Sequence, residues 1–149
     1  MRIYLDNCCY GRPYDKQDSD KIIDETMSLR KIFKSISIKN IELATSYILH
    51  YENNKKNDID IKTKIFEFMK YNRTVHIGIE NVPKLTEMTA KIMETGVKTN
   101  DAYHVASAIL ANCDYFLTTD RRLLKYQSDK ITLMNPVNFV KILEADKND

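Results

Sequence analysis

Hydrophobic positions along the chain follow two spacings, one typical of helices and one typical of buried strands. The clearest case is the segment 100–120, in which Ala102, Val105 and Ile109 recur on one face of a helix. After a polar turn, Tyr115–Thr119 is rich in aromatic and β-branched residues, which is typical of a short strand. The segment therefore predicts a core-facing helix, a turn and a buried strand.

The same alternation continues over the rest of the chain. Further strands are predicted at 3–5, 41–45, 75–79 and 131–134, and further helices at about 20–34, 47–52, 61–71, 83–93, 121–127 and from 136 onwards. The segment 7–20 carries Gly11 and Pro13 and is predicted to be a loop. Strands that alternate with helices indicate a parallel sheet covered by helices on both faces, so the predicted fold class is α/β.

Composition supports one ordinary globular domain over residues 1–149. The chain is 43% hydrophobic and 30% charged, and neither an internal repeat nor a linker interrupts it. Only the polar segment 146–149 is predicted to be a flexible tail. The net charge of +2 is nearly balanced, so any binding of nucleic acid must come from a local basic patch.

The cysteines indicate a reducing compartment. Cys8, Cys9 and Cys113 are odd in number and form no CxxC pair, which argues against a disulfide framework and a zinc site. The first ten residues lack the apolar run of a signal peptide, and no stretch approaches the roughly 18 apolar residues of a membrane span. These features predict a cytoplasmic protein with no membrane partner.

Acidic residues stand directly after two of the predicted strands. Asp6 follows the first strand and Asp120 follows Tyr115–Thr119, while Asp101 opens the helix between them. The carboxyl ends of parallel strands form the ligand crevice of an open α/β sheet, which makes these acids candidate site residues. Taken singly, Asp101 also fits a first-turn acid and Asp120 a helix cap.

Two glutamates compete for a fourth position in this crevice. Glu42 stands at the start of its predicted strand, at the sheet edge opposite to Asp6, whereas Glu52 lies about two turns into the helix that leaves the strand's carboxyl end. The geometry favours Glu52, with a solvated helix surface as the alternative reading.

Four carboxylates in one crevice need a cation. Without one they repel each other and their pKa values rise. Ligation by oxygen alone selects a hard ion such as Mg²⁺ or Mn²⁺, which keeps water ligands and recruits phosphate oxygens. The arrangement predicts a metal-dependent phosphodiesterase.

The chain resembles the PIN-domain nucleases, in particular a bacterial and archaeal branch that begins with a motif like DNCCYxRP. The matching stretches are IYLDNCCYGRP, IELATSYILHYEN, KTNDAYHVASAILANCDYFLTTDRRLLK and ITLMNPVNFV. The resemblance implies an α/β/α sandwich around a parallel sheet. It also implies that Asp6, Glu52, Asp101 and Asp120 are the catalytic, metal-binding acids, with Glu52 a ligand or a base that positions water.

Many members of that family are ribonucleases, including VapC-like toxins of toxin–antitoxin pairs. The resemblance therefore implies an RNA substrate, Mg²⁺ or Mn²⁺ as cofactor, an antitoxin partner and a homodimer. The chain departs from the family pattern where Asn7 and Cys8 replace the usual Thr or Ser, and where Gly11 replaces an Asn. The four acids are intact.

Other residues near these motifs have competing interpretations. His104 is interpreted as a residue that packs or points outward, and Cys8 and Cys9 as small packing residues. Asn7 and Thr118 either orient the acids or make only turn and strand-end hydrogen bonds, and the second interpretation is favoured. Arg12 is interpreted either as a phosphate contact or as a surface arginine. A basic path is envisaged at Arg121, Arg122 and Lys125, whereas Lys55 and Lys56 are assigned to a solvated face.

Two other functions were compared with a nuclease. A catalytically idle PIN-like module would bind RNA or a protein through the same crevice, but the intact acids argue against it. A phosphatase of the HAD type requires a second Asp two residues after the first, and Cys8 occupies that position.

Overall fold

The computed structural model describes the backbone of residues 1–148 and the side chains of residues 1–146. Its centre is a five-stranded sheet in the order β3-β2-β1-β4-β5, in which every neighbouring pair is parallel. The strands are β1 (Arg2–Leu5), β2 (Glu42–Ser46), β3 (Val75–Ile77), β4 (Tyr115–Leu117) and β5 (Thr132–Met134). The predicted α/β class with a parallel sheet is confirmed.

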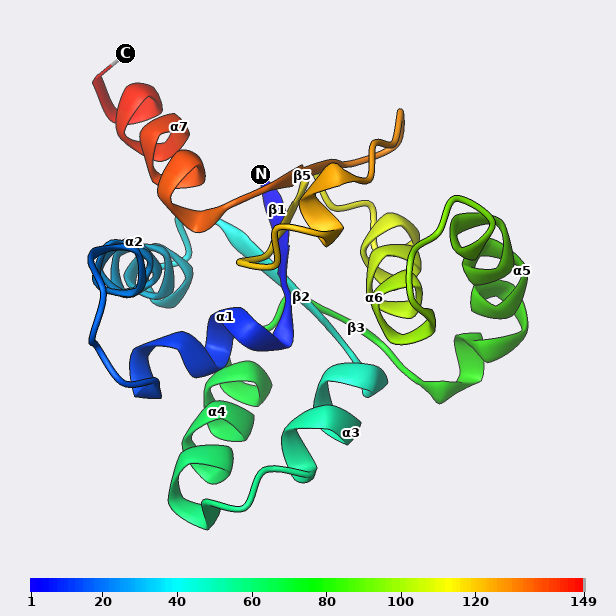
Figure 1. Ribbon diagram of the computed structural model, residues 1–149, viewed down its shortest axis with the longest axis horizontal. Coiled ribbons are helices and arrows are strands. Elements are labelled where there is room, and N and C mark those ends of the chain that lie inside the picture. Colours follow the sequence, from blue (N-terminus) through cyan, green and yellow to red (C-terminus); the bar gives the residue numbers. More distant parts are fainter. Residues whose placement is uncertain (149) are drawn as a thin grey trace.

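Helices cover both faces of this sheet, as predicted. In Figure 1, α2 and α7 lie against each other on the left of the sheet, and α5 and α6 lie against each other on its right. The helices are α1 (Asn7–Gly11), α2 (Asp20–Ser37), α3 (Tyr47–Asn54), α4 (Ile59–Asn72), α5 (Val82–Met93), α6 (Thr99–Leu110) and α7 (Pro136–Asn148), with 3₁₀ turns η1 (Arg12–Tyr14), η2 (Ile79–Asn81) and η3 (Leu123–Lys125).

The central strand β1 explains why the sheet holds together. Ile3, Tyr4 and Leu5 are completely buried, because α-helices cover both faces and β2 and β4 cover both edges. Such a continuous apolar run is typical of a strand in a parallel sheet. The rings of Tyr4 and Phe116 stack with their centroids 5.3 Å apart and join β1 to β4.

The segment 7–20 is not the loop that the sequence predicted, since it contains α1 and η1. A carboxylate oxygen of Asp6 accepts from the backbone N of Asn7 at 2.8 Å and caps α1. Cys9 and Tyr10 are buried against the core, and Pro13 occupies the first turn of η1. Burial of these side chains favours a helix here although Gly11 and Pro13 favour a loop. The local sequence does not show this burial.

Smaller differences concern element ends. The predicted basic helix 121–127 is only the 3₁₀ turn η3, and β4 ends at Leu117, two residues before the predicted end. Helix α7 includes positions 146–148 of the segment predicted as a flexible tail, and Asp149 lies outside the described residues.

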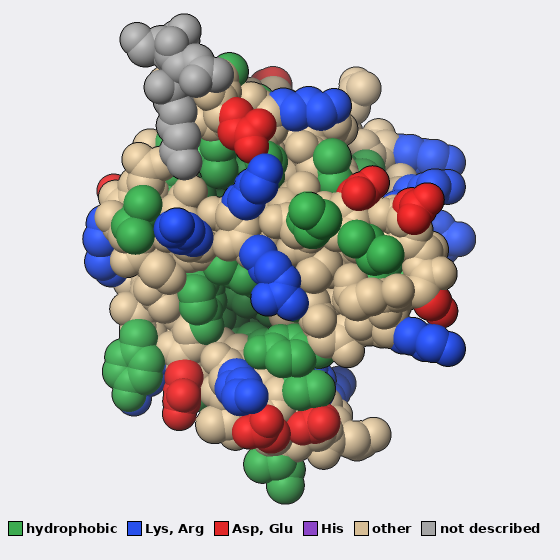
Figure 2. Space-filling model, turned by 90° about the vertical axis from the view of Figure 1, so that its left-hand side faces the viewer, with side chains coloured by type: hydrophobic (Ala, Val, Ile, Leu, Met, Phe, Trp, Pro, Cys, Tyr) green, Lys and Arg blue, Asp and Glu red, His purple; other side chains and the backbone are tan. Residues whose placement is uncertain are grey.

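Surface charge is mixed on the face that carries α2 and α7. Figure 2 shows Lys and Arg side chains among Asp and Glu side chains there, around a hollow with hydrophobic side chains. This mixture matches the nearly balanced net charge of +2. Among residues 1–148, no helix is both long and apolar enough to cross a bilayer.

Candidate active site

Asp6 lies at the carboxyl end of β1 and is held from several sides. Its side chain is nearly buried, with 7% of the residue exposed. One carboxylate oxygen accepts from the backbone N of Asn7, and the other accepts from the hydroxyl of Thr118 at 2.8 Å and from the thiol of Cys8 at 3.5 Å. Because α1 carries Asn7 and Cys8, and Thr118 directly follows β4, the orientation of Asp6 is set by the helix that begins after it and by the neighbouring strand.

Thr118 joins Asp6 to Asp120. Its hydroxyl donates to Asp6 and accepts from the backbone N of Asp120 at 3.1 Å. Asp120 itself is exposed, and its side chain accepts from the backbone N of Arg122 at 2.9 Å. Of the two sequence interpretations of Thr118, the contact with Asp6 supports the one in which its side chain orients the acids.

Asp101, Asp120 and Glu52 line one cleft of about 770 Å³ at the carboxyl edge of the sheet. The remaining lining residues are Lys98, Thr99, Asn100 and Arg122. Burial raises the pKa of Asp101, and the negative charges of Asp6, Asp120 and Glu52 raise it further, against an opposite effect of His104. Asp6 does not line the cleft, but its charge acts on Asp101.

Glu52 is oriented by a buried chain of hydrogen bonds. One carboxylate oxygen contacts Nε2 of His104, whose Nδ1 lies 2.7 Å from the hydroxyl of Tyr4. That hydroxyl lies 2.7 Å from Oγ of Ser46. Glu42, by contrast, pairs with Arg2 at 2.9 Å at the other end of the sheet, in agreement with the sequence-based choice of Glu52.

His104 has a larger part in the site than the sequence suggested. It is 1% exposed, so the expectation that it packs is confirmed, but its contact with Glu52 was missed. Burial lowers the pKa of His104, while the hydrogen bond to Glu52 and the charges of Asp6, Glu52 and Asp101 raise it, with a raised pKa as the net result. The sequence did contain a signal for this role: His104 lies one turn after Asp101, and residues three apart share a helix face.

The four carboxylates offer only oxygen ligands to a metal ion. Within residues 1–146, no three His, Cys, Asp or Glu side chains lie close enough to form a ready-made ligand cluster. The donor chemistry nevertheless fits a hard divalent ion, because the acids offer only oxygen atoms and raise the pKa of Asp101. An open arrangement suits an ion that completes its coordination with water and substrate oxygens.

Burial of Asp101 and its repulsion by the neighbouring acids predict a stability effect for Asp101→Asn. A raised folded-state pKa means that protonated Asp101 favours the fold below the unfolded pKa, and that this stabilisation is lost as the pH rises through the folded pKa. At neutral pH the substitution should therefore raise the melting temperature by about 1–3 °C, a small change because solvent screens a half-buried group.

Thermal unfolding of the metal-free proteins checks this expectation at two pH values. The difference between wild type and Asp101→Asn should shrink as the pH falls through the raised pKa of folded Asp101 and should be lost below about 4, where the carboxyl is protonated in both the folded and the unfolded chain. An Asp101→Asn protein that is less stable than wild type at pH 7 would contradict the repulsion between the acids.

Two basic positions differ from their sequence interpretations. Arg12 is not a free surface residue, because it pairs with Asp15 and with the buried Glu25, both at 3.0 Å, and its interpretation as a phosphate contact stays a prediction. Lys55 is exposed over the ring of Tyr51, as expected for a solvated face. Lys56 is half-buried instead, and burial lowers its pKa although Asp15, Glu52 and Cys8 act in the opposite direction.

Comparison with known proteins identifies the class. A sequence model described as the PIN domain matches residues 19–128, and the chain therefore belongs to the PIN-domain family. The match includes Glu52, Asp101 and Asp120 and begins after Asp6. PIN domains are generally nucleases.

Solved structures show the same fold at low sequence identity. VapBC2 from Rickettsia felis, crystallised with a DNA fragment from its promoter, is 16% identical with a TM-score of 0.55, over 91% of this chain and 98% of that one. FitAcB from Neisseria gonorrhoeae is 15% identical with a TM-score of 0.54, over 90% of this chain and 97% of that one. No curated protein sequence matches the chain significantly.

Proposed function

We propose that this protein is a nuclease that hydrolyses RNA phosphodiester bonds with a divalent metal ion, Mg²⁺ or Mn²⁺. The observation that carries the proposal is that Glu52, Asp101 and Asp120 line one cleft, where burial and the charges of Asp6, Asp120 and Glu52 raise the pKa of Asp101. Acids that are held together against their repulsion are typical of a functional site. Membership in the PIN-domain family adds support.

Each acid has a distinct task in this proposal. Asp6, Asp101 and Asp120 would hold the ion, and Glu52 would be a further ligand or would orient the attacking water. The ion supplies positive charge that makes a water molecule acidic near neutral pH and offsets charge on the reacting phosphate.

The surrounding residues keep these carboxylates in position. Thr118 donates to Asp6 and accepts from the backbone of Asp120, so one hydroxyl sets the spacing of two acids. His104 holds Glu52 on one oxygen, which leaves the other oxygen available to water or to an ion. Lys98 and Arg122 line the same cleft and offer positive charge to the phosphates of the strand.

An antitoxin is the proposed protein partner. The support is structural similarity to VapBC2, a protein crystallised with promoter DNA, and to FitAcB. A homodimer is proposed on the resemblance to toxin-like PIN proteins. Co-expression with the product of an adjacent small gene, followed by co-purification and size-exclusion chromatography, tests both assemblies.

The function is tested by incubating the purified chain with a panel of single-stranded RNAs in Mg²⁺, in Mn²⁺ and in EDTA. We expect cleavage in at least one metal and complete loss in EDTA. Undiminished cleavage in EDTA would contradict the metal mechanism, and intact RNA in both metals would contradict the nuclease itself.

The second candidate function is a catalytically idle module that binds RNA or a protein through the same cleft. Two observations favour it: residues 1–146 contain no ready-made metal cluster, and one oxygen of Glu52 is already engaged by His104. RNA binding without cleavage in the same panel would select this candidate.

A further inference from the structure

A side pocket opens directly from the acidic cleft. It has a volume of about 340 Å³, within the range of small-molecule sites, and shares Lys98, Asp101 and Arg122 with the cleft. The other lining residues are Thr95, Gly96, Val97, Leu123, Lys125, Tyr126 and Gln127. The pocket thus lies between the loop that precedes α6 and the turn η3.

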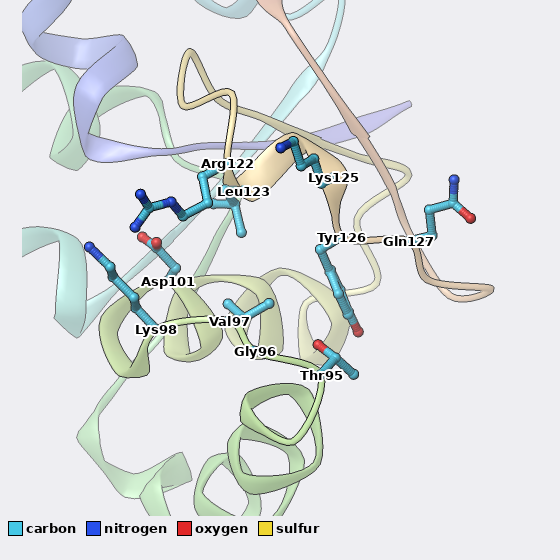
Figure 3. A pocket seen from close by; sticks show the side chains of 10 residues that line it. All are labelled: Thr95, Gly96, Val97, Lys98, Asp101, Arg122, Leu123, Lys125, Tyr126 and Gln127. Atoms are coloured by element: carbon cyan, nitrogen blue, oxygen red, sulfur yellow. The ribbon is translucent and has the colours of Figure 1, made fainter.

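The two ends of this side pocket differ in chemistry. Figure 3 shows Lys98, Asp101 and Arg122 together at one end, while the ring of Tyr126 forms a wall at the other end, with Thr95 beside its hydroxyl. Val97 and Leu123 add apolar surface between them. A ligand that fits both ends needs negative charge near the cleft and a flat aromatic group near Tyr126.

Local backbone geometry fixes both walls. Gly96 has φ of 101°, a conformation that favours glycine, and lies in the turn after α5, where its backbone N donates to the carbonyl of Met93 at 2.9 Å. On the opposite wall, the backbone N of Tyr126 donates to the carbonyl of Leu123 at 3.0 Å, and Leu123 is buried in the core. The position of the Tyr126 ring is therefore fixed by the backbone of η3 and by the buried Leu123.

We propose that the side pocket binds one unpaired base of a single-stranded RNA, stacked on Tyr126, with the adjoining phosphate between Lys98 and Arg122. This inference rests on the proposed function and names the form of its substrate. Base stacking on an aromatic ring and phosphate contacts to Lys and Arg are the two usual elements of single-strand recognition. A base inside a duplex is already stacked and paired and cannot enter the pocket.

The test measures binding in EDTA, so that cleavage plays no part. Fluorescence anisotropy with a labelled single-stranded RNA compares wild type, Tyr126→Phe, which keeps a ring, and Tyr126→Leu, which does not. Loss of one stacked base should weaken binding by about 5- to 30-fold for Tyr126→Leu and by less than about twofold for Tyr126→Phe. The matched control is Tyr71→Leu, at a 72% exposed tyrosine on α4, which should bind like wild type.

A second set of RNAs separates a base contact from a folding effect. Each RNA lacks the base at one position, and at one of these positions wild type and Tyr126→Leu should bind equally, because the stacked partner is already absent. Equal binding by wild type and Tyr126→Leu on the intact RNA would overturn the inference. The inference would also be overturned if wild type and Tyr126→Leu differed in affinity by the same factor on every abasic RNA. Duplex RNA that binds wild type as tightly as the single strand would overturn it as well.

These outcomes are independent of the nuclease assay. If Tyr126→Leu loses RNA affinity in a base-dependent way but the protein shows no metal-dependent cleavage, the side-pocket proposal stands and the nuclease proposal is rejected. Cleavage that persists while Tyr126→Leu binds like wild type would keep the nuclease and reject the side pocket.

Discussion

Replacing Asp6 or Asp101 by Asn should lower the metal-dependent rate of RNA cleavage by roughly 10²–10³-fold. Each substitution keeps the shape of the side chain but removes a negative charge that would hold the cation, and electrostatic groups of this kind typically contribute that much to a rate. Both oxygens of Asp6 accept hydrogen bonds, so Asn can keep the bond from Asn7 on its one oxygen while its amide N–H donates to the hydroxyl of Thr118. Single-turnover cleavage of one RNA by each variant, at saturating Mg²⁺ or Mn²⁺, measures the loss.

Glu42→Gln is the matched control for this series. Glu42 is also an acid of the sheet, as the first residue of β2, but it pairs with Arg2 at the opposite end from Asp6. The variant should cleave at the wild-type rate. Cleavage that survives in both Asp6→Asn and Asp101→Asn would show that the activity comes from another site or from a contaminant.

Arg12→Met should destabilise the fold by about 2–3 kcal/mol, which corresponds to a fall in melting temperature of roughly 4–12 °C. The substitution leaves Glu25, which is 1% exposed, without its charged partner, and Asn135 remains as its hydrogen-bond donor at 2.7 Å. Removal of one member of a buried pair is costly because the other charge stays out of water. Thermal and urea unfolding of the metal-free proteins provide the measurement.

A double variant and a surface control separate this effect from general damage. Arg12→Met combined with Glu25→Met removes both charges and should recover most of the lost stability, since an apolar pair of similar volume often replaces a buried ion pair well. Arg30→Met, at an exposed arginine of α2, should unfold like wild type. Loss of RNA binding in Arg12→Met without loss of stability would support the interpretation of Arg12 as a phosphate contact.

Local patterns in the sequence were sufficient for most of the framework. The apolar face of α6 and the hydrophobic run of β1 predicted these elements, because periodicity depends only on which residues an element buries. The parallel arrangement followed from the alternation of strands and helices. Once strands are parallel their carboxyl ends share one edge, and this explains why Asp120, Asp101 and Glu52 line the same cleft.

The elements that were missed depend on partners far away in the sequence. Helix α1 contains turn-forming residues and exists because Cys9 and Tyr10 are buried against the core. Arg12 pairs with Glu25 and not with solvent, and no local pattern distinguishes these two outcomes. In both cases burial, and not residue type, decides the role.

By itself, the sequence determined the α/β class and the approximate positions of the strands, because these follow from periodicity and turn chemistry. The direction of parallel strands then made the four acids candidate site residues. Only the tertiary structure decided how the acids are supported. His104 contacts Glu52, Thr118 links Asp6 to Asp120, and Tyr126 walls a side pocket that opens from the cleft. These contacts join residues from different strands, helices and turns, and their geometry is set by the packing of the sheet against its helices, which no single stretch of the chain encodes.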